Sequence, residues 1–175
     1  MVLEQDRGSL PYALVHGEAL VACAAWALGE AGVTLIDAGT PWSSLVEAGD
    51  SLVLHDPLCP LTPPEFLAEC VAAAEDGAVV VGVRPVTDTV KVVIDGYVGA
   101  TVDRDALLQV ASPVVLPAMV VAELGELPTS DLTALVAALA PHVEVTTREA
   151  PPSARRIGST EDLRLLEALT TPQGT

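Results

Sequence analysis

Basic residues are scarce in this chain of 175 residues. It has eight Lys and Arg residues against 24 Asp and Glu, a formal net charge of −16, and Lys91 is its only lysine. Nucleic acids and anionic membrane surfaces attract proteins through a field of Lys and Arg. The composition therefore argues against nucleic acid and membrane as the main partners.

Targeting and membrane-spanning patterns are also missing. The N-terminus has no basic start followed by an apolar stretch, and the longest apolar run, 19–28, is about half of the ~20 residues that span a bilayer. The three cysteines, Cys23, Cys59 and Cys70, are an odd number without metal-ligand spacing, as is typical of free thiols. We expect a reduced, cytoplasmic protein.

Apolar residues are half of the chain although only 3% are aromatic, so Ala, Val and Leu can build the core of one domain over residues 1–175. Short runs of Val, Leu and Ile alternate with segments of helical periodicity. The expected strands are 33–37, 51–55 and 78–83. The expected helices are 17–31, 62–76 with Thr62 as its cap, 130–140 and 159–169. Such apolar strands are typical of a parallel sheet with helices on both faces, so we expect an α/β fold of three layers.

A hairpin interrupts this alternation. Two strand-like runs, 90–94 and 97–102, are separated by Asp95-Gly96, which predicts a two-residue turn of type I′. We expect the hairpin to project from the sheet as a β-arm over about 86–102. The apolar residues of this arm predict a homodimer in which the arms of two chains are exchanged.

Four motifs follow in order along the chain. They are Leu54-His55-Asp56-Pro57-Leu58-Cys59-Pro60, Arg84-Pro85-Val86-Thr87-Asp88-Thr89-Val90-Lys91, Thr101-Val102-Asp103-Arg104 and Ile157-Gly158-Ser159-Thr160-Glu161-Asp162-Leu163. In this order and spacing they resemble the signatures of the 2-C-methyl-D-erythritol 4-phosphate cytidylyltransferase family.

The resemblance implies a Rossmann-like nucleotidyltransferase sheet, a dimer with crossing β-arms, and Mg²⁺-dependent transfer of a cytidylyl group from CTP to methylerythritol phosphate in the non-mevalonate isoprenoid pathway. By resemblance, Thr89 and Arg104 bind the phosphorylated sugar alcohol, and Arg156 takes the place of a family lysine with the same role. Asp56 matches a carboxylate that binds the metal. Ser44 is kept from the cytosine-binding stretch, where Pro41 replaces an arginine.

The nucleotide half departs from the family pattern. The family's Gly-x-Gly loop is replaced by residues 1–12, and Pro11-Tyr12 falls where the family has Pro-Lys. Residues 1–83 contain twelve carboxylates and one cation, Arg7, a net charge of 1 − 12 = −11. Phosphoryl-type transfer depends on cations and backbone donors, so the sequence predicts a binding or regulatory homologue with weak or no CTP turnover and assigns no catalytic residue.

The alternatives stay open at this point. The alternative function is that of an active cytidylyltransferase whose nucleotide site is rebuilt from other residues. Mg²⁺ has a role only in that case. The structural alternatives are a turn cap for Asp56, a β-branched arm residue for Thr89, and an ion pair with Asp88 or Asp103 for Arg104. His55 is expected to be a packed or hydrogen-bonded residue at the end of a strand.

Overall fold

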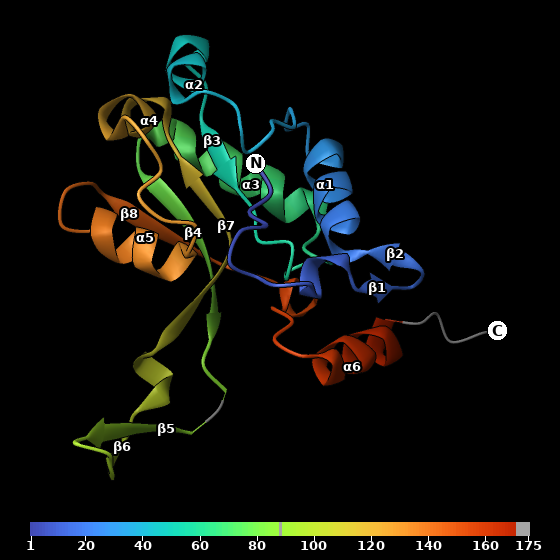
Figure 1. The fold of residues 1–175 in the computed structure, drawn as a ribbon. Helices are drawn as coiled ribbons and strands as arrows, with labels where there is room; N and C mark the ends of the chain where they lie inside the picture. The colour runs from blue at the N-terminus through green and yellow to red at the C-terminus, as the bar shows by residue number, and fades with distance from the viewer. Residues whose placement is uncertain (88, 171–175) are drawn as a thin grey trace.

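The centre of the fold is a mixed four-stranded sheet in the order β3-β7-β4-β8 (Figure 1). The computed structural model describes residues 1–87 and 89–170. The strands are β3 (Leu52–Leu54), β4 (Val79–Pro85), β7 (Leu108–Leu116) and β8 (Val145–Glu149). Strand β7 is antiparallel to both β3 and β4, while β4 and β8 are parallel. The α/β fold class is thus confirmed, but the expected all-parallel sheet is wrong.

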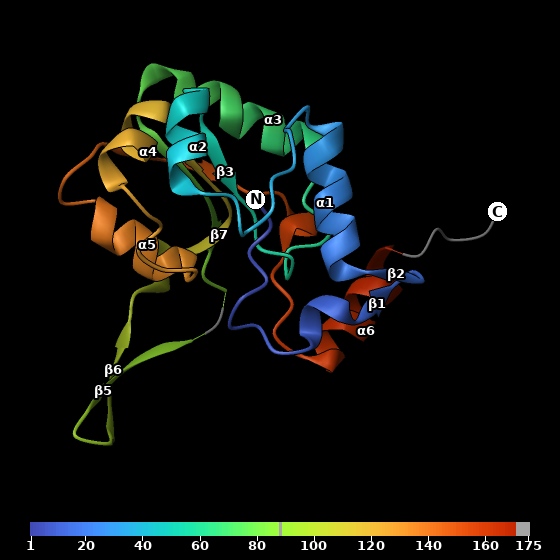
Figure 2. The ribbon, with the colours of Figure 1, turned by 45° about the horizontal axis from the view of Figure 1, so that its top comes forward.

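Alternating side chains along the strands divide the core between the two faces of the sheet. Val79 and Val81 of β4 pack with α4 (Ala118–Leu124) and α5 (Leu132–Leu139), whereas Val80 between them packs with α1 (Leu20–Glu30) and α3 (Pro64–Ala73). Successive strand residues point to opposite faces, so a continuous valine run fills both cores. Helix α2 (Trp42–Ala48) lies over the first face beside α4. Helix α6 (Thr160–Thr170) packs near the small hairpin of β1 (Leu14–Val15) and β2 (Glu18–Ala19) (Figure 2).

Two helix starts differ from the sequence expectation. Helix α1 begins at Leu20 rather than at residue 17, because His16 and Gly17 have positive φ values of 49° and 87° and form the turn between β1 and β2. Thr62 does not cap α3, since Pro63 is the N-cap residue and the Thr62 hydroxyl donates to the Cys59 carbonyl at 2.8 Å.

The N-terminal segment extends the sheet beyond β3. Val2 forms a parallel bridge with His55, and the Leu3 amide donates to the His55 carbonyl at 2.9 Å. The segment 33–37, by contrast, is not a strand, so that expectation is wrong.

The β-arm projects from the body as a separate two-stranded sheet of β5 (Val90–Ile94) and β6 (Tyr97–Val102) (Figures 1 and 2). Asp95 and Gly96 have φ values of 51° and 82°, as the expected type I′ turn requires. Large apolar side chains on the arm are exposed, among them Tyr97 at 81% and Val98 at 71%. Within the described part of the chain, no helix is both long and apolar enough to cross a bilayer.

Candidate functional site

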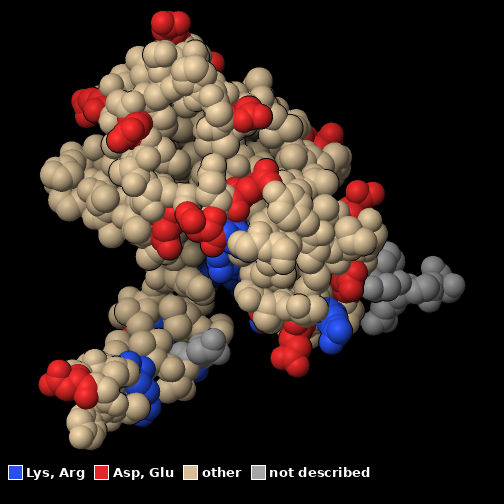
Figure 3. Space-filling model, in the orientation of Figure 1, with Lys and Arg blue, Asp and Glu red and all other residues tan. Residues whose placement is uncertain are grey.

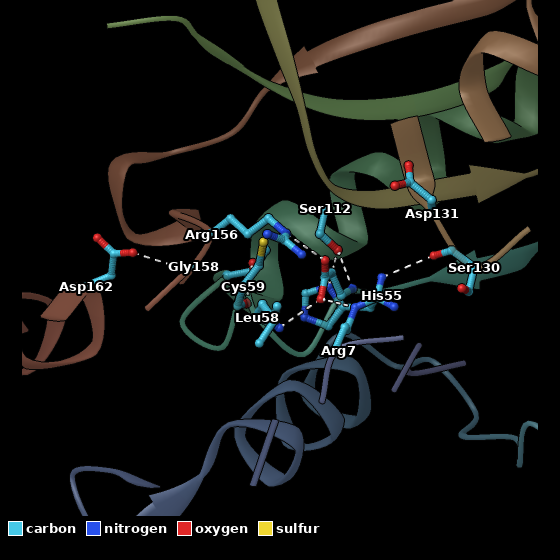
Figure 4. A network of polar contacts seen from close by, with 12 residues as sticks. Arg7, His55, Leu58, Cys59, Ser112, Ser130, Asp131, Arg156, Gly158 and Asp162 are labelled. Atoms are coloured by element: carbon cyan, nitrogen blue, oxygen red, sulfur yellow. Dashed lines mark hydrogen bonds and ion pairs between the residues drawn. The ribbon is translucent and has the colours of Figure 1, made fainter. Parts of the chain in front are cut away.

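Asp56 is a buried residue just after β3, and its carboxylate is part of a network of polar contacts. Figure 4 shows this network with Arg7, Ser112 and Arg156 among its labelled members. The carboxylate of Asp56 is bound on both oxygens: Arg7 Nε donates to Oδ1 at 2.7 Å, and Arg156 Nε donates to Oδ2 at 3.0 Å. The Leu58 amide donates to Oδ1 at 3.0 Å, which makes Asp56 the cap of its own turn. The structural alternative of a turn cap is therefore confirmed, and the carboxylate joins segments from opposite ends of the chain.

The electrostatics of Asp56 follow from these contacts. Burial by itself raises the pKa of the carboxyl group, but hydrogen bonds from Arg7 and the Leu58 amide and the charges of Arg7 and Arg156 outweigh it. The pKa of Asp56 is consequently lowered, and the carboxylate is ionised at neutral pH.

Each nitrogen of the Arg7 guanidinium group donates a hydrogen bond within the protein. Besides Asp56, it donates through its other two nitrogens to the carbonyls of Gln5, at 2.6 Å, and Ser130, at 3.1 Å. The side chain of Asp6 accepts from the Ser130 hydroxyl at 2.9 Å. These bonds hold residues 5–7 of the N-terminal segment against the loop that precedes α5.

Ser112 supports Asp56 from strand β7. Its Oγ accepts from the Asp56 amide at 3.0 Å and lies 2.5 Å from Nδ1 of the fully buried His55. Burial lowers the pKa of His55 to about 4, so the ring is neutral, and its Nδ1 shares a hydrogen bond with the Ser112 hydroxyl. A side chain at Gly82 on β4 would place a Cβ 2.7 Å from the Ser112 carbonyl oxygen, so only glycine permits this close approach.

A cavity of about 220 Å³ opens beside Asp56. Its polar lining comes from Arg7, Asp56, Gln109, Asp131, Thr133 and Arg156. Typical pockets for drug-sized ligands have volumes of ~300–1,000 Å³, so this one suits a smaller polar molecule. Its position at the end of β3, next to the start of α5, is where ligands of α/β sheets gather.

The expected site residues fall into two groups. Asp56 and Arg156 meet at the cavity, whereas Thr89 and Arg104 are exposed residues of the arm segment. Arg104 donates to the Thr87 carbonyl, and its alternative partner Asp103 instead accepts from the Asp105 amide at 3.1 Å. The other alternative partner, Asp88, lies outside the described residues.

Ser44 is exposed on α2, and its amide donates to the Pro41 carbonyl. It does not line the cavity beside Asp56. Figure 3 shows carboxylates spread over the body, while most of the visible Lys and Arg atoms lie at the junction with the arm and along the arm.

Sequence reasoning missed Arg7 and Ser112 as members of the site. Arg7 had one usable signal, since it is the single cation among residues 1–83. Ser112 had none, because its contacts with His55 and Asp56 span 57 and 56 positions of the chain.

The residues around Asp56 do not fit a magnesium ion. Mg²⁺ demands an octahedral shell of oxygen ligands and is usually held by one or two carboxylates together with substrate phosphates. Both Asp56 oxygens instead face guanidinium groups, and the described residues contain no group of three or more His, Cys, Asp or Glu suited to a metal.

The sheet with helices on both faces, the β-arm and the polar site after β3 define an α/β domain of the nucleotidyltransferase type. Residues 42–168 match the family model of IspD, 2-C-methyl-D-erythritol 4-phosphate cytidylyltransferase. The chain belongs to this family, and the resemblance expected from its motifs is confirmed.

Curated relatives named as this enzyme include those of Chlorobium phaeobacteroides, 31% identical over 145 residues, and Frankia casuarinae, 39% identical over 125 residues. The first match covers 77% of this chain and 54% of the relative; the second covers 67% and 46%. The chain thus spans about half the length of these relatives.

Solved structures share the fold over almost the whole chain. The 2-C-methyl-D-erythritol 4-phosphate cytidylyltransferase of Thermus thermophilus superposes with a TM-score of 0.72 at 25% identity and covers 97% of both chains. The 4-diphosphocytidyl-2C-methyl-D-erythritol synthase of Anaerococcus prevotii has a TM-score of 0.70 at 16% identity, with 96% of this chain and 92% of that chain covered.

Proposed function

We propose that this chain is a cytoplasmic, single-domain member of its family that does not transfer cytidylyl groups and instead binds a small phosphorylated sugar alcohol. One observation carries the proposal. Arg7 is the single cation of residues 1–83, and its three nitrogens donate to Asp56, Gln5 and Ser130. No cation of this half is left to meet a triphosphate.

The surroundings of the N-terminal segment support the same conclusion. Tyr12, which stands where the family has a lysine, donates its hydroxyl to Glu4 at 2.7 Å. That hydrogen bond, with the charge of Glu4 and some desolvation, raises the pKa of Tyr12, so the side chain stays uncharged. A triphosphate would approach a region with a net charge of −11 and no glycine-rich cradle of amides.

The cavity beside Asp56 supports a smaller anionic ligand. Arg156 uses only its Nε on Asp56, and its two terminal nitrogens have no hydrogen-bonding partner within residues 1–87 and 89–170. They are available to a phosphate group, for which a guanidinium is the preferred side chain. Gln109 and Thr133 add polar groups for a hydroxylated carbon chain.

The arm residues enter this proposal through a homodimer. Thr89 and Arg104 carry exposed donors, and large apolar side chains of the arm beside them are exposed, among them Ile94 at 65% and Tyr97 at 81%. We propose that arm exchange brings Thr89 and Arg104 to the Asp56 cavity of the other protomer. Each ligand site would then draw on both chains.

Thermal unfolding with added ligand tests the proposal. A ligand at a hundred times its dissociation constant stabilises a protein by ~2.7 kcal/mol, which is an easily measured shift in melting temperature. We expect a shift with 2-C-methyl-D-erythritol 4-phosphate and none with millimolar CTP and Mg²⁺. A shift given by CTP and not by ATP or GTP would contradict the proposal and favour a rebuilt nucleotide site.

A further inference from the structure

A second hollow, here called the edge groove, lies at the β3 side of the sheet, away from the Asp56 cavity. It has a volume of about 550 Å³ and runs between the segment 33–36, α2, β3 and α3. Ile36, Leu45, Leu52 and Val71 are its apolar walls, and the exposed Asp50 and Glu75 are acidic groups on its lining.

One wall of the edge groove is a strand-like segment without a strand partner. Residues 33–36 read Val-Thr-Leu-Ile, a composition strongly favoured in β-sheets. The Val33 amide donates to the Leu28 carbonyl at 3.0 Å, but the amides of residues 34–36 have no hydrogen-bonding partner in the described chain. A segment of this composition whose amides and carbonyls are unpaired can form hydrogen bonds with an added strand.

The opposite wall, along β3, also has one backbone position without a hydrogen-bonding partner in the described chain, at Ser51. Along β3, the backbone groups of Val53 and His55 face the N-terminal segment. The Val53 carbonyl accepts from the Met1 amino group, and the His55 amide donates to the Met1 carbonyl. Ser51 faces the same side, because backbone groups two residues apart in a strand point the same way. Its backbone has no hydrogen-bonding partner among the described residues, and it lines the edge groove.

We propose that the edge groove binds an extended peptide segment of a partner protein, apolar in its middle and flanked by Lys or Arg, as an added strand beside residues 33–36. In this mode of recognition the main chain supplies hydrogen bonds and alternate side chains enter apolar pockets. Residues 1–83 carry a net charge of −11, and Asp50 and Glu75 line the groove itself. This negative charge favours a peptide with Lys or Arg on either side of its apolar middle. A second copy of this chain, at −16, is repelled by the same field.

Amide-resolved NMR with synthetic peptides tests the proposal. The probe is a capped peptide Lys-Val-Thr-Val-Thr-Val-Lys, with one control in which both lysines are glutamate and another in which the central valine is proline. We expect the basic peptide to shift the amides of residues 34–36 and to slow their hydrogen exchange, with weaker binding at higher salt. Neither control should do so.

The proposal is overturned if these amides do not respond, or if the glutamate or proline peptide acts equally. It is also overturned if rising protein concentration alone protects the same amides, since the occupant is then a second copy of the chain. None of these outcomes changes the result expected for CTP binding, so this proposal and the proposed function are tested separately.

Two variants separate backbone pairing from overall stability. Leu35 is 49% exposed and its amide is unpaired, so Leu35→Pro removes a donor that the free protein does not use. We expect Leu35→Pro to weaken peptide binding at least ~10-fold relative to Leu35→Ala, the equivalent of ~1.4 kcal/mol. Charge reversal by Glu75→Lys should weaken binding without changing the circular dichroism. Equal affinity of the proline and alanine variants would overturn the proposal.

Discussion

Arg7 and Asp56 form a buried ion pair in which Nε and Oδ1 are 2.7 Å apart and each side chain is 6% exposed. The pair connects the N-terminal segment to the loop after β3. The two charges face each other, so Arg7 neutralises a carboxylate that burial alone would leave unfavourably placed.

Loss of Arg7 should destabilise the protein strongly. Arg7→Met leaves Asp56 buried with Arg156 as its one cationic partner, and breaking a buried pair from one side typically costs about 3–5 kcal/mol. Urea unfolding should therefore show a free energy of unfolding lowered by about 3 kcal/mol.

The matched control for this prediction is Arg164→Met on the exposed face of α6, which should change stability by less than ~0.5 kcal/mol. Adding Asp56→Asn to the Arg7→Met variant should recover part of the loss, because the buried charge is then removed. Equal effects of Arg7→Met and Arg164→Met would contradict the structural role of the pair.

Stability should fall in mildly acidic solution because of His55. The pKa of His55 is lowered from 6.5 to about 4, so between these values the unfolded chain binds a proton that the folded chain does not. The contribution of His55 is fully present above pH 6.5 and is lost as the pH falls toward 4. A shift of this size corresponds to roughly 3 kcal/mol.

His55→Asn provides the control, since the side-chain amide can accept from or donate to Ser112 but does not titrate. Chemical unfolding from pH 7 to pH 4.5 should show a flatter pH dependence for this variant than for the parent. Identical slopes would show that other groups cause the acid sensitivity.

The β-arm should hold two chains together. Replacing Val92 and Ile94 by lysine should give monomers, whereas Leu169→Lys on α6, an apolar position about as exposed as Ile94, should leave the dimer intact. Because each chain carries −16, the dimer rests on apolar contact, and moderate salt should leave it unchanged or strengthen it. Sedimentation equilibrium that finds a monomer for the parent chain at micromolar concentration would contradict arm exchange.

Arg156 should be required for binding of the phosphorylated ligand. A hydrogen bond to a charged group contributes about 1.5–3 kcal/mol, so Arg156→Gln should weaken the binding of 2-C-methyl-D-erythritol 4-phosphate by roughly 10- to 100-fold in calorimetry. Its neighbour Arg155, which contacts Asp162 at 3.5 Å, is the control: Arg155→Gln should bind normally. If both variants bind like the parent, the ligand does not occupy this cavity.

The local features of the fold could be predicted from the sequence. Asp95-Gly96 specified its turn because both residues accept positive φ, and four motifs in order were enough to indicate the family. Strand β7 was missed because Ser112-Pro113 reads as a turn, whereas proline in a central strand is uncommon. The structure accommodates it where the pairing of β4 with β7 shifts register between Val81 and Val83.

The site was predictable only in part, for a related reason. Asp56 and Arg156 belong to recognisable motifs, but the arginine that binds the other Asp56 oxygen comes from a segment without any motif, 49 positions away. The expected strand 33–37 failed because strand formation requires a paired neighbour, which propensity alone does not report.

Pyrophosphate release from CTP tests the central claim most directly. The protein is mixed with CTP, 2-C-methyl-D-erythritol 4-phosphate and Mg²⁺, and pyrophosphate is followed over hours at protein concentrations high enough to detect very slow turnover. The account predicts no release above a heat-denatured sample, while the sugar phosphate alone still raises the melting temperature. Release of pyrophosphate that depends on both substrates would contradict it and would establish a working nucleotide site.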